Sequence, residues 1–293
     1  MPTRRDAISG SLTAALAAAF AAPAGAASAE RSLKEIHKRI GGRLGVHVLD
    51  SQSGRRFGID ENARFAMAST FKLPLAAALL WQVDRGAFTL ERSLPIAKKD
   101  LLANSPAVEA KLAAGVSVMT LRELCAAIVT QSDNAAANLL LAGIGGPRAL
   151  TKFFHDSVGD SVTRFDRAEP ELNGNAPGDP RDTTSPRAMV DSLLRLFTQD
   201  VLSLPSRALL IDWMTASRTG LDRVRAGIPR GWQVGDKTGT GENGAVNDLA
   251  VAYPPGRRPI FVAVYMSESK LATAELAAAH AEIGRLVADE KWP

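Results

Sequence analysis

The chain has 293 residues, with 35 lysines and arginines against 31 aspartates and glutamates, and a formal net charge of +4. This small excess is spread without basic runs, which argues against nucleic acid or a charged membrane surface as the main partner. Cys125 is the one cysteine, so no internal disulfide can form, and we expect a buried structural thiol. The four histidines show no metal-ligand spacing, so we predict no metal and no other cofactor.

Residues 1–29 have the organisation of a removable export signal. Arg4 and Arg5 precede an apolar run at 12–22, and small residues at 27–29 form a cleavage site. The run is too short to span a bilayer comfortably, so we predict no stable membrane association after the signal is removed. We expect a periplasmic or secreted protein. The arginine pair resembles a twin-arginine signal, although it also suits the general secretory route.

Residues 30–293 are predicted to form one domain with two lobes. Extended patterns lie near both ends of this segment, at 43–50, 55–60, 231–238, 246–253 and 260–266. Helical patterns occur at 32–40, 71–83, 120–130, 187–198, 206–214 and 271–290. We therefore expect one sheet in a lobe formed by about 30–64 and 228–293, with a helical lobe at about 65–227.

Two capping boxes predict helix starts, because a hydroxyl and a carboxylate three residues apart can satisfy the first N–H groups of a helix. One box pairs Ser32 with Glu35, and the other pairs Thr120 with Glu123. Between 164 and 182 no period is sustained, and prolines and glycines interrupt a polar stretch of nearly balanced charge. A segment of this kind inside a compact domain predicts either a functional loop or disorder, and its nearly balanced charges allow internal ion pairs to hold it.

A serine and a lysine stand three residues apart where an apolar helical pattern begins. On a helix, Ser69 and Lys72 would lie on one face, about one turn apart. A serine hydroxyl needs a base before it becomes a good nucleophile, and a buried lysine of lowered pKa can be that base. Because Ser267 and Lys270 have the same spacing by chance, the pair indicates catalysis only together with other motifs.

Two further motifs follow in the chain, Ser132-Asp133-Asn134 and Lys237-Thr238-Gly239. Together with 69–72, and in this order, they resemble the three active-site motifs of the serine β-lactamases and penicillin-binding proteins. The segment 164–173 resembles the active-site loop of class A β-lactamases, which penicillin-binding proteins lack. The resemblance covers essentially all of residues 30–293 and identifies the chain as a member of class A.

The resemblance implies an α/β (α+β) fold of the β-lactamase/transpeptidase type. This fold has a five-stranded antiparallel sheet flanked by helices, plus an all-helical lobe. The implied activity is hydrolysis of the β-lactam amide bond of penicillin- and cephalosporin-type antibiotics through a serine acyl-enzyme, which confers resistance. The implied partner is the small-molecule substrate alone, and the implied state is a monomer.

The resemblance also assigns roles to individual residues. The implied catalytic residues are Ser69, Lys72, Ser132, Glu169, Asn173 and Lys237. The implied substrate-binding residues are Asn104, Asn134, Arg223, Thr238, Gly239 and Thr240. Either Lys72 or Glu169 acting through a water would take the proton of Ser69. Arg167 and Asp182 would tie the loop ends by an ion pair, and the Glu169–Pro170 peptide bond would be cis.

Some positions depart from the family pattern. Asn104 stands where many members have an aromatic residue that lines the mouth of the site, so the substrate preference is open. Thr240 and Arg223 resemble carbapenem-hydrolysing members, but Ala68 and Gly241 exclude the disulfide that many of those carry.

Two alternatives remain at this point. One is a D,D-peptidase of the same fold, which is acylated by β-lactams but deacylates slowly, and Glu169 argues against it. The other is a non-catalytic cell-wall or ligand-binding homologue, which the complete set of motif residues argues against.

Overall fold

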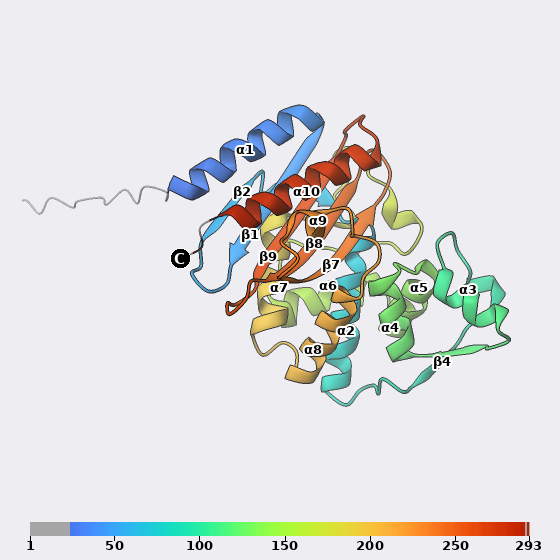
Figure 1. Ribbon diagram of the computed structural model, residues 1–293. Helices are drawn as coiled ribbons and strands as arrows, with labels where there is room; N and C mark the ends of the chain where they lie inside the picture. Colours follow the sequence, from blue (N-terminus) through green and yellow to red (C-terminus); the bar gives the residue numbers. More distant parts are fainter. Residues whose placement is uncertain (1–23, 291, 293) are drawn as a thin grey trace, which may run out of the picture.

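The computed structural model describes residues 24–290 and 292, and its centre is a five-stranded antiparallel sheet (Figure 1). The strand order is β2-β1-β9-β8-β7. The strands are β1 (Arg43–Asp50), β2 (Arg56–Ile59), β7 (Gln233–Thr240), β8 (Val246–Tyr253) and β9 (Ile260–Ser267). Strands from the two ends of the chain therefore share one sheet, and the predicted fold class is confirmed.

Both faces of the sheet are covered, because side chains of a strand alternate between its faces. Val262 and Val264 of β9 pack in a core with α1 (Ala24–Ile40) and α10 (Thr273–Asp289), which lie side by side across one face (Figure 1). Phe261, Ala263 and Tyr265 face the opposite way and pack against the helical lobe. All eight residues of β9 are consequently buried.

The helical lobe is built around α2 (Lys72–Asp84), whose residues 72–80 are all buried. Its other helices are α3 (Pro106–Ala113), α4 (Leu121–Thr130), α5 (Asn134–Gly143), α6 (Pro147–Phe153), α7 (Pro186–Thr198) and α8 (Leu204–Thr215). The short α9 (Val224–Gly227) instead packs with α10 in the core on the other face of the sheet. Four short strands also occur in the helical lobe: β3 (Phe65–Ala66) pairs with β6 (Thr183–Thr184), and β4 (Ser93–Pro95) pairs with β5 (Val118–Thr120). Runs of two or three residues are too short for a sequence period to predict.

The N-terminal helix starts earlier than the sequence predicted. Residues 1–23 of the expected export signal lie outside the described residues, and its expected cleavage site lies within α1. The capping box at Ser32 was a wrong prediction, because Ser32 is inside α1. Alanine-rich sequence has the highest helix propensity and extends the helix past this residue.

The second capping box, by contrast, is confirmed. The Thr120 hydroxyl accepts the backbone N–H of Glu123 at 3.1 Å, and the Glu123 carboxylate accepts that of Thr120 at 2.8 Å. The Cys125 side chain is fully buried in α4, and burial raises the pKa of its thiol to about 12. This is the inert structural cysteine that was expected.

Within residues 24–290 and 292, no helix combines the length and the apolarity that a membrane crossing requires. The same residues contain no group of three or more histidine, cysteine, aspartate or glutamate side chains that could hold a metal ion.

Helices α9 and α10 cross with their backbones in contact. A Cβ atom at Gly284 of α10 would lie 2.1 Å from the carbonyl oxygen of Val224, and one at Gly227 would lie 2.0 Å from that of Ala281. No side chain fits at either position. Because Arg223 immediately precedes α9, this crossing also holds Arg223 in place.

We predict that Gly284→Ala lowers the free energy of unfolding by about 1–3 kcal/mol, the usual cost of forcing extra atoms into a packed interior. Gly143→Ala is the matched control, because Gly143 also lies in a helix and a Cβ there meets nothing within 4 Å. The control should be neutral or stabilised by up to about 1 kcal/mol. Urea unfolding measures both values, and equal stability of the two variants would contradict the close crossing.

Candidate active site

Ser69 and Lys72 meet at the start of α2. Ser69 lies in a 3₁₀ turn, Ala68–Phe71, that leads directly into the helix. The Lys72 Nζ lies 3.0 Å from the Ser69 Oγ. The first N–H groups of a helical turn have no partner within the turn, so the Ser69 N–H belongs to the class of donors that can stabilise an oxyanion. The structure therefore brings a hydroxyl, an amine and a backbone donor together.

The Lys72 amine is fully buried and surrounded by oxygen atoms. Its Nζ lies 2.8 Å from Glu169 Oε1, 2.5 Å from Asn134 Oδ1 and 2.9 Å from the carbonyl oxygen of Ser132. Burial lowers the pKa of Lys72 below its ordinary value, and the neighbouring Glu169 carboxylate opposes this effect. A lowered pKa makes the neutral amine, the form that can accept a proton, more accessible.

Ser132 lies between two lysines, in the turn between α4 and α5. Its Oγ is 3.3 Å from the Nζ of Lys72 and 3.1 Å from the Nζ of Lys237. Lys237 on β7 is also fully buried. Burial, and secondly the charge of Lys72, hold the pKa of Lys237 well below its usual range. The three groups form a continuous path along which a proton can move.

Glu169 is fixed from both sides. Its Oε2 accepts the Asn173 amide at 2.5 Å, and its side chain is buried. The Glu169–Pro170 peptide bond is cis, as expected. Asn138 of α5 was missed by the sequence analysis: its amide pairs with the backbone of Glu169 at 2.9 and 2.8 Å. Its position four residues after Asn134, on the same helix face, was the available signal.

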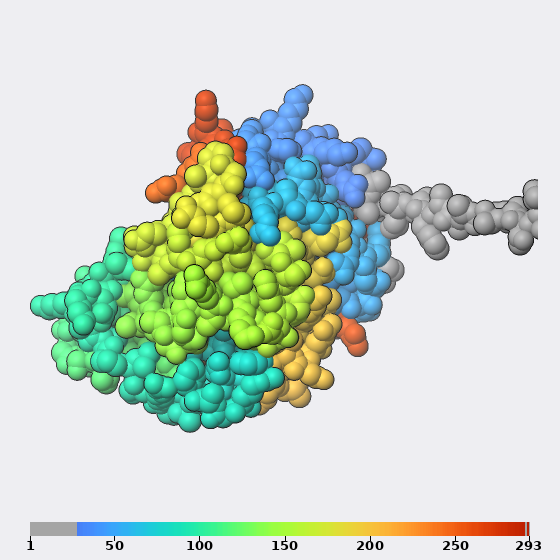
Figure 2. Space-filling view, turned by 180° about the vertical axis from the view of Figure 1, so that it is seen from behind, coloured from blue at the N-terminus to red at the C-terminus, as the bar shows by residue number. Residues whose placement is uncertain are grey.

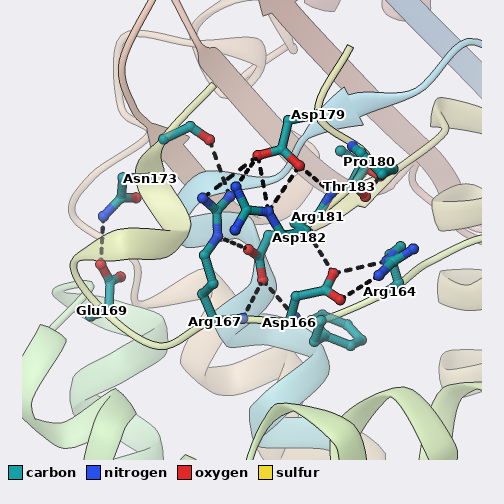
Figure 3. A network of polar contacts seen from close by, with 12 residues as sticks. Arg164, Asp166, Arg167, Glu169, Asn173, Asp179, Pro180, Arg181, Asp182 and Thr183 are labelled. Atoms are coloured by element: carbon teal, nitrogen blue, oxygen red, sulfur yellow. Dashed lines mark hydrogen bonds and ion pairs between the residues drawn. The ribbon is translucent and has the colours of Figure 1, made fainter. Parts of the chain in front are cut away.

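Ion pairs and hydrogen bonds join the two ends of the loop 164–182. The expected Arg167–Asp182 ion pair is present at 2.6 Å (Figure 3). The Asp182 carboxylate also accepts the backbone N–H groups of Asp166 and Arg167 at 2.8 and 3.0 Å. Asp166 in turn pairs with Arg164 at 2.6 Å. Figure 2 shows the loop at the surface of the molecule, next to the N-terminal part of the chain.

Strand β7 carries Thr238, Gly239 and Thr240 past the nucleophile. A Cβ atom at Gly239 would lie 2.7 Å from the carbonyl oxygen of Met67, so only glycine lets the strand pass this close to the 3₁₀ turn. The Arg223 guanidinium donates to Thr240 Oγ1 at 2.7 Å and to the Gly239 carbonyl at 3.0 Å. Strand β7 therefore carries polar groups past Ser69, and the buried Arg223 guanidinium is bonded to two of its residues.

The remaining predicted residues, Asn134 and Asn104, are connected with Ser132 and its neighbours. The Asn134 amide donates to the carbonyl oxygen of Ala103 at 2.8 Å, and the Asn104 amide donates to that of Ser132 at 2.9 Å. Asn104 itself is exposed. Beside the nucleophile, a Cβ atom at Gly241 would lie 3.3 Å from the Cβ of Ala68, so these two positions are neighbours without a disulfide.

Fold and site together define a class of proteins: enzymes in which an active-site serine attacks the substrate and becomes acylated, with the help of buried lysines. Ser69 lies beside the buried Lys72 and Glu169, and hydrogen bonds connect this group with Ser132, Asn134, Asn173 and Lys237. Glu169 lies on a loop that ion pairs hold in place. This carboxylate distinguishes the site from that of a transpeptidase.

Comparisons with known proteins agree with this class. Residues 28–290 match the model of the β-lactamase enzyme family. The chain is 44% identical to β-lactamase L2 of Stenotrophomonas maltophilia, over 86% of this chain and 82% of the relative. It is 45% identical to the carbapenem-hydrolysing β-lactamase KPC of Klebsiella oxytoca, over 79% of this chain and 78% of the relative.

A solved structure also matches closely. The class A β-lactamase of the last common ancestor of Gram-negative bacteria aligns with a TM-score of 0.86 and 54% identity, covering 89% of this chain and 98% of the other. The chain therefore belongs to the β-lactamase enzyme family, among the class A serine enzymes.

We predict that Glu169→Gln lowers the pKa of Lys72 further, because the Glu169 carboxylate is the main group that opposes the effect of burial. Glu171→Gln is the matched control, since Glu171 is an exposed carboxylate on the same loop. An NMR titration of side-chain-labelled lysine measures the change. A Lys72 pKa that rises in Glu169→Gln, or that falls equally in both variants, would contradict this electrostatic account.

Proposed function

We propose that the chain hydrolyses the β-lactam amide bond of penicillin- and cephalosporin-type antibiotics through an acyl-enzyme on Ser69. One observation carries this proposal. The Ser69 Oγ lies 3.0 Å from Lys72 Nζ and 3.4 Å from Glu169 Oε1, so two buried bases are within reach of one hydroxyl. This activity confers resistance to β-lactam antibiotics.

In the acylation step, Ser69 attacks the lactam carbonyl and its proton passes to a base. The lowered pKa of Lys72 supports direct transfer to the amine. The alternative base is Glu169 acting through a water, and its Oε1 lies 3.4 Å from the Ser69 Oγ. The backbone N–H groups of Ser69 and Thr240 stabilise the oxyanion, each contributing about 3 kcal/mol. Ser132, bonded to Lys237, then donates a proton to the departing lactam nitrogen.

In the deacylation step, Glu169 deprotonates a water that attacks the ester. Asn173 holds one oxygen of the carboxylate and Lys72 contacts the other. Among the described residues, the buried Oδ1 of Asn173 has no hydrogen-bond partner, so it is available to orient that water. The Glu169 carboxylate and the Asn173 amide together support a hydrolase over a D,D-peptidase.

The substrate carboxylate is bound by Lys237, Ser132, Thr238 and Thr240. Arg223 stands behind Thr240 and adds positive charge to this socket. Asn134 and Asn104 complete the substrate-binding set. Every step uses protein groups and water, so the proposed reaction requires no cofactor.

We also propose that the enzyme is exported and acts as a monomer in the periplasm or outside the cell. The arginine pair and apolar run of residues 1–29 support export, by the twin-arginine or the general secretory route.

Hydrolysis of a chromogenic cephalosporin, followed together with intact mass, tests the function. The parent should turn over, whereas Glu169→Ala should accumulate a covalent adduct, with deacylation slowed by about 10²–10⁴-fold because the general base is lost. Glu171→Ala, altered on the same loop, should behave like the parent. Stoichiometric acylation of the parent without turnover would favour the peptidase, and no adduct in any variant would leave a binding role.

A further inference from the structure

Hydrogen bonds join the segment 103–108 to the segment 132–135, which contains Ser132. The carbonyl of Asn104 accepts the Asn134 N–H at 2.9 Å, and Ser105 Oγ accepts the Ala135 N–H at 3.1 Å. Asp133 accepts two N–H groups of α3, from Ala107 and Val108, at 2.8 and 3.1 Å. These bonds hold the neighbours of Ser132 but do not reach Ser132 itself.

Asn104 makes the bond that does reach it. Its Nδ2 donates to the carbonyl oxygen of Ser132 at 2.9 Å, and Lys72 Nζ donates to the same oxygen at 2.9 Å. A carbonyl oxygen has two lone pairs, so these two donors satisfy it completely. The Asn104 amide thus shares an acceptor with the lysine beside the nucleophile.

Ser132 needs a contact that holds its carbonyl because its backbone conformation is unfavourable. Its φ of 59° lies in the left-handed region, which is costly for a serine and persists only when surrounding contacts hold it. The same backbone conformation directs the Ser132 Oγ between the amines of Lys72 and Lys237. A contact that fixes the carbonyl therefore also fixes the hydroxyl.

We infer that Asn104 is a positioning residue for the Ser132 hydroxyl, acting through the Ser132 carbonyl. The inference rests on the proposed function, in which Ser132 donates a proton during acylation. No hydrogen bond or ion pair in the described part of the chain joins the Asn104 side chain directly to Glu169 or Asn173. Loss of the Asn104 amide consequently slows acylation and leaves deacylation unchanged.

The simpler alternative is that Asn104 only supplies the backbone conformation at its own position. Asn104 has a φ of 60°, and asparagine tolerates the left-handed region better than most residues, so it could serve the backbone alone. Glycine adopts this conformation without strain and has no amide, whereas alanine lacks the amide and is strained as well. The pair Asn104→Gly and Asn104→Ala therefore distinguishes the two roles.

The experiment measures acylation by stopped-flow with a chromogenic cephalosporin and by intact mass, and deacylation by the decay of the isolated adduct. Both Asn104 variants should acylate about tenfold more slowly, the effect of losing one hydrogen bond, and should deacylate within about twofold of the parent. Asn243→Gly is the matched control, because Asn243 has a φ of 49° and donates to the Asn175 carbonyl at 3.2 Å. It should acylate at the parental rate.

Parental acylation by Asn104→Gly would overturn the inference, as would an equal slowing of acylation and deacylation. Thermal unfolding of each variant identifies any general loss of stability. A parent that is acylated without turnover would contradict the proposed hydrolysis but would still test Asn104, since its acylation rate remains measurable. A parent that is never acylated would overturn both.

Discussion

The burial of one ammonium group organises the site. Removing the Lys72 amine from water is costly unless polar partners replace the solvent. Its partners come from two separate parts of the chain: the turn before α5 together with the first residue of α5, and the loop that carries Glu169. Those segments must converge for the lysine to be stable inside. The same convergence places Lys72, Ser132, Glu169 and Asn173 within two hydrogen bonds of Ser69, and Lys237 within three.

In the loop 164–182, charged side chains hold the backbone in place without a regular hydrogen-bond ladder. Residues 164–182 contain little helix or strand, so their polar groups need other partners. Asp182 binds one guanidinium and two backbone N–H groups, and Asp166 binds another guanidinium together with the backbone N–H of Asp182. The balanced charges seen in the sequence thus replace secondary structure at this place.

Much of the fold and of the site could be predicted from the sequence, since both leave local signals. The strands β7, β8 and β9 show extended patterns between turn residues, and the three motifs occur in their family order. The start of α1 and Asn138 were missed although each had a local signal, namely an alanine-rich sequence and a four-residue spacing from Asn134. The short strand pairs β3–β6 and β4–β5 could not be predicted, because each depends on a partner elsewhere in the chain. The Asn104 amide is similar: its position was identified as a departure from the family, but its bond to Ser132 is visible only in three dimensions.

The pairing of β1 with β9 has a consequence for biosynthesis. Arg43 lies opposite Ser267 and Asp50 opposite Ile260, so β1, whose other neighbour is the adjacent β2, pairs here with a strand that follows only after all the helices from α2 to α9. Closing so long a loop is entropically costly, and contacts this distant form late. A ribosome that has not yet released β9 therefore holds a chain whose central sheet cannot be assembled. The order of synthesis thus delays completion of the sheet until β9 has been made.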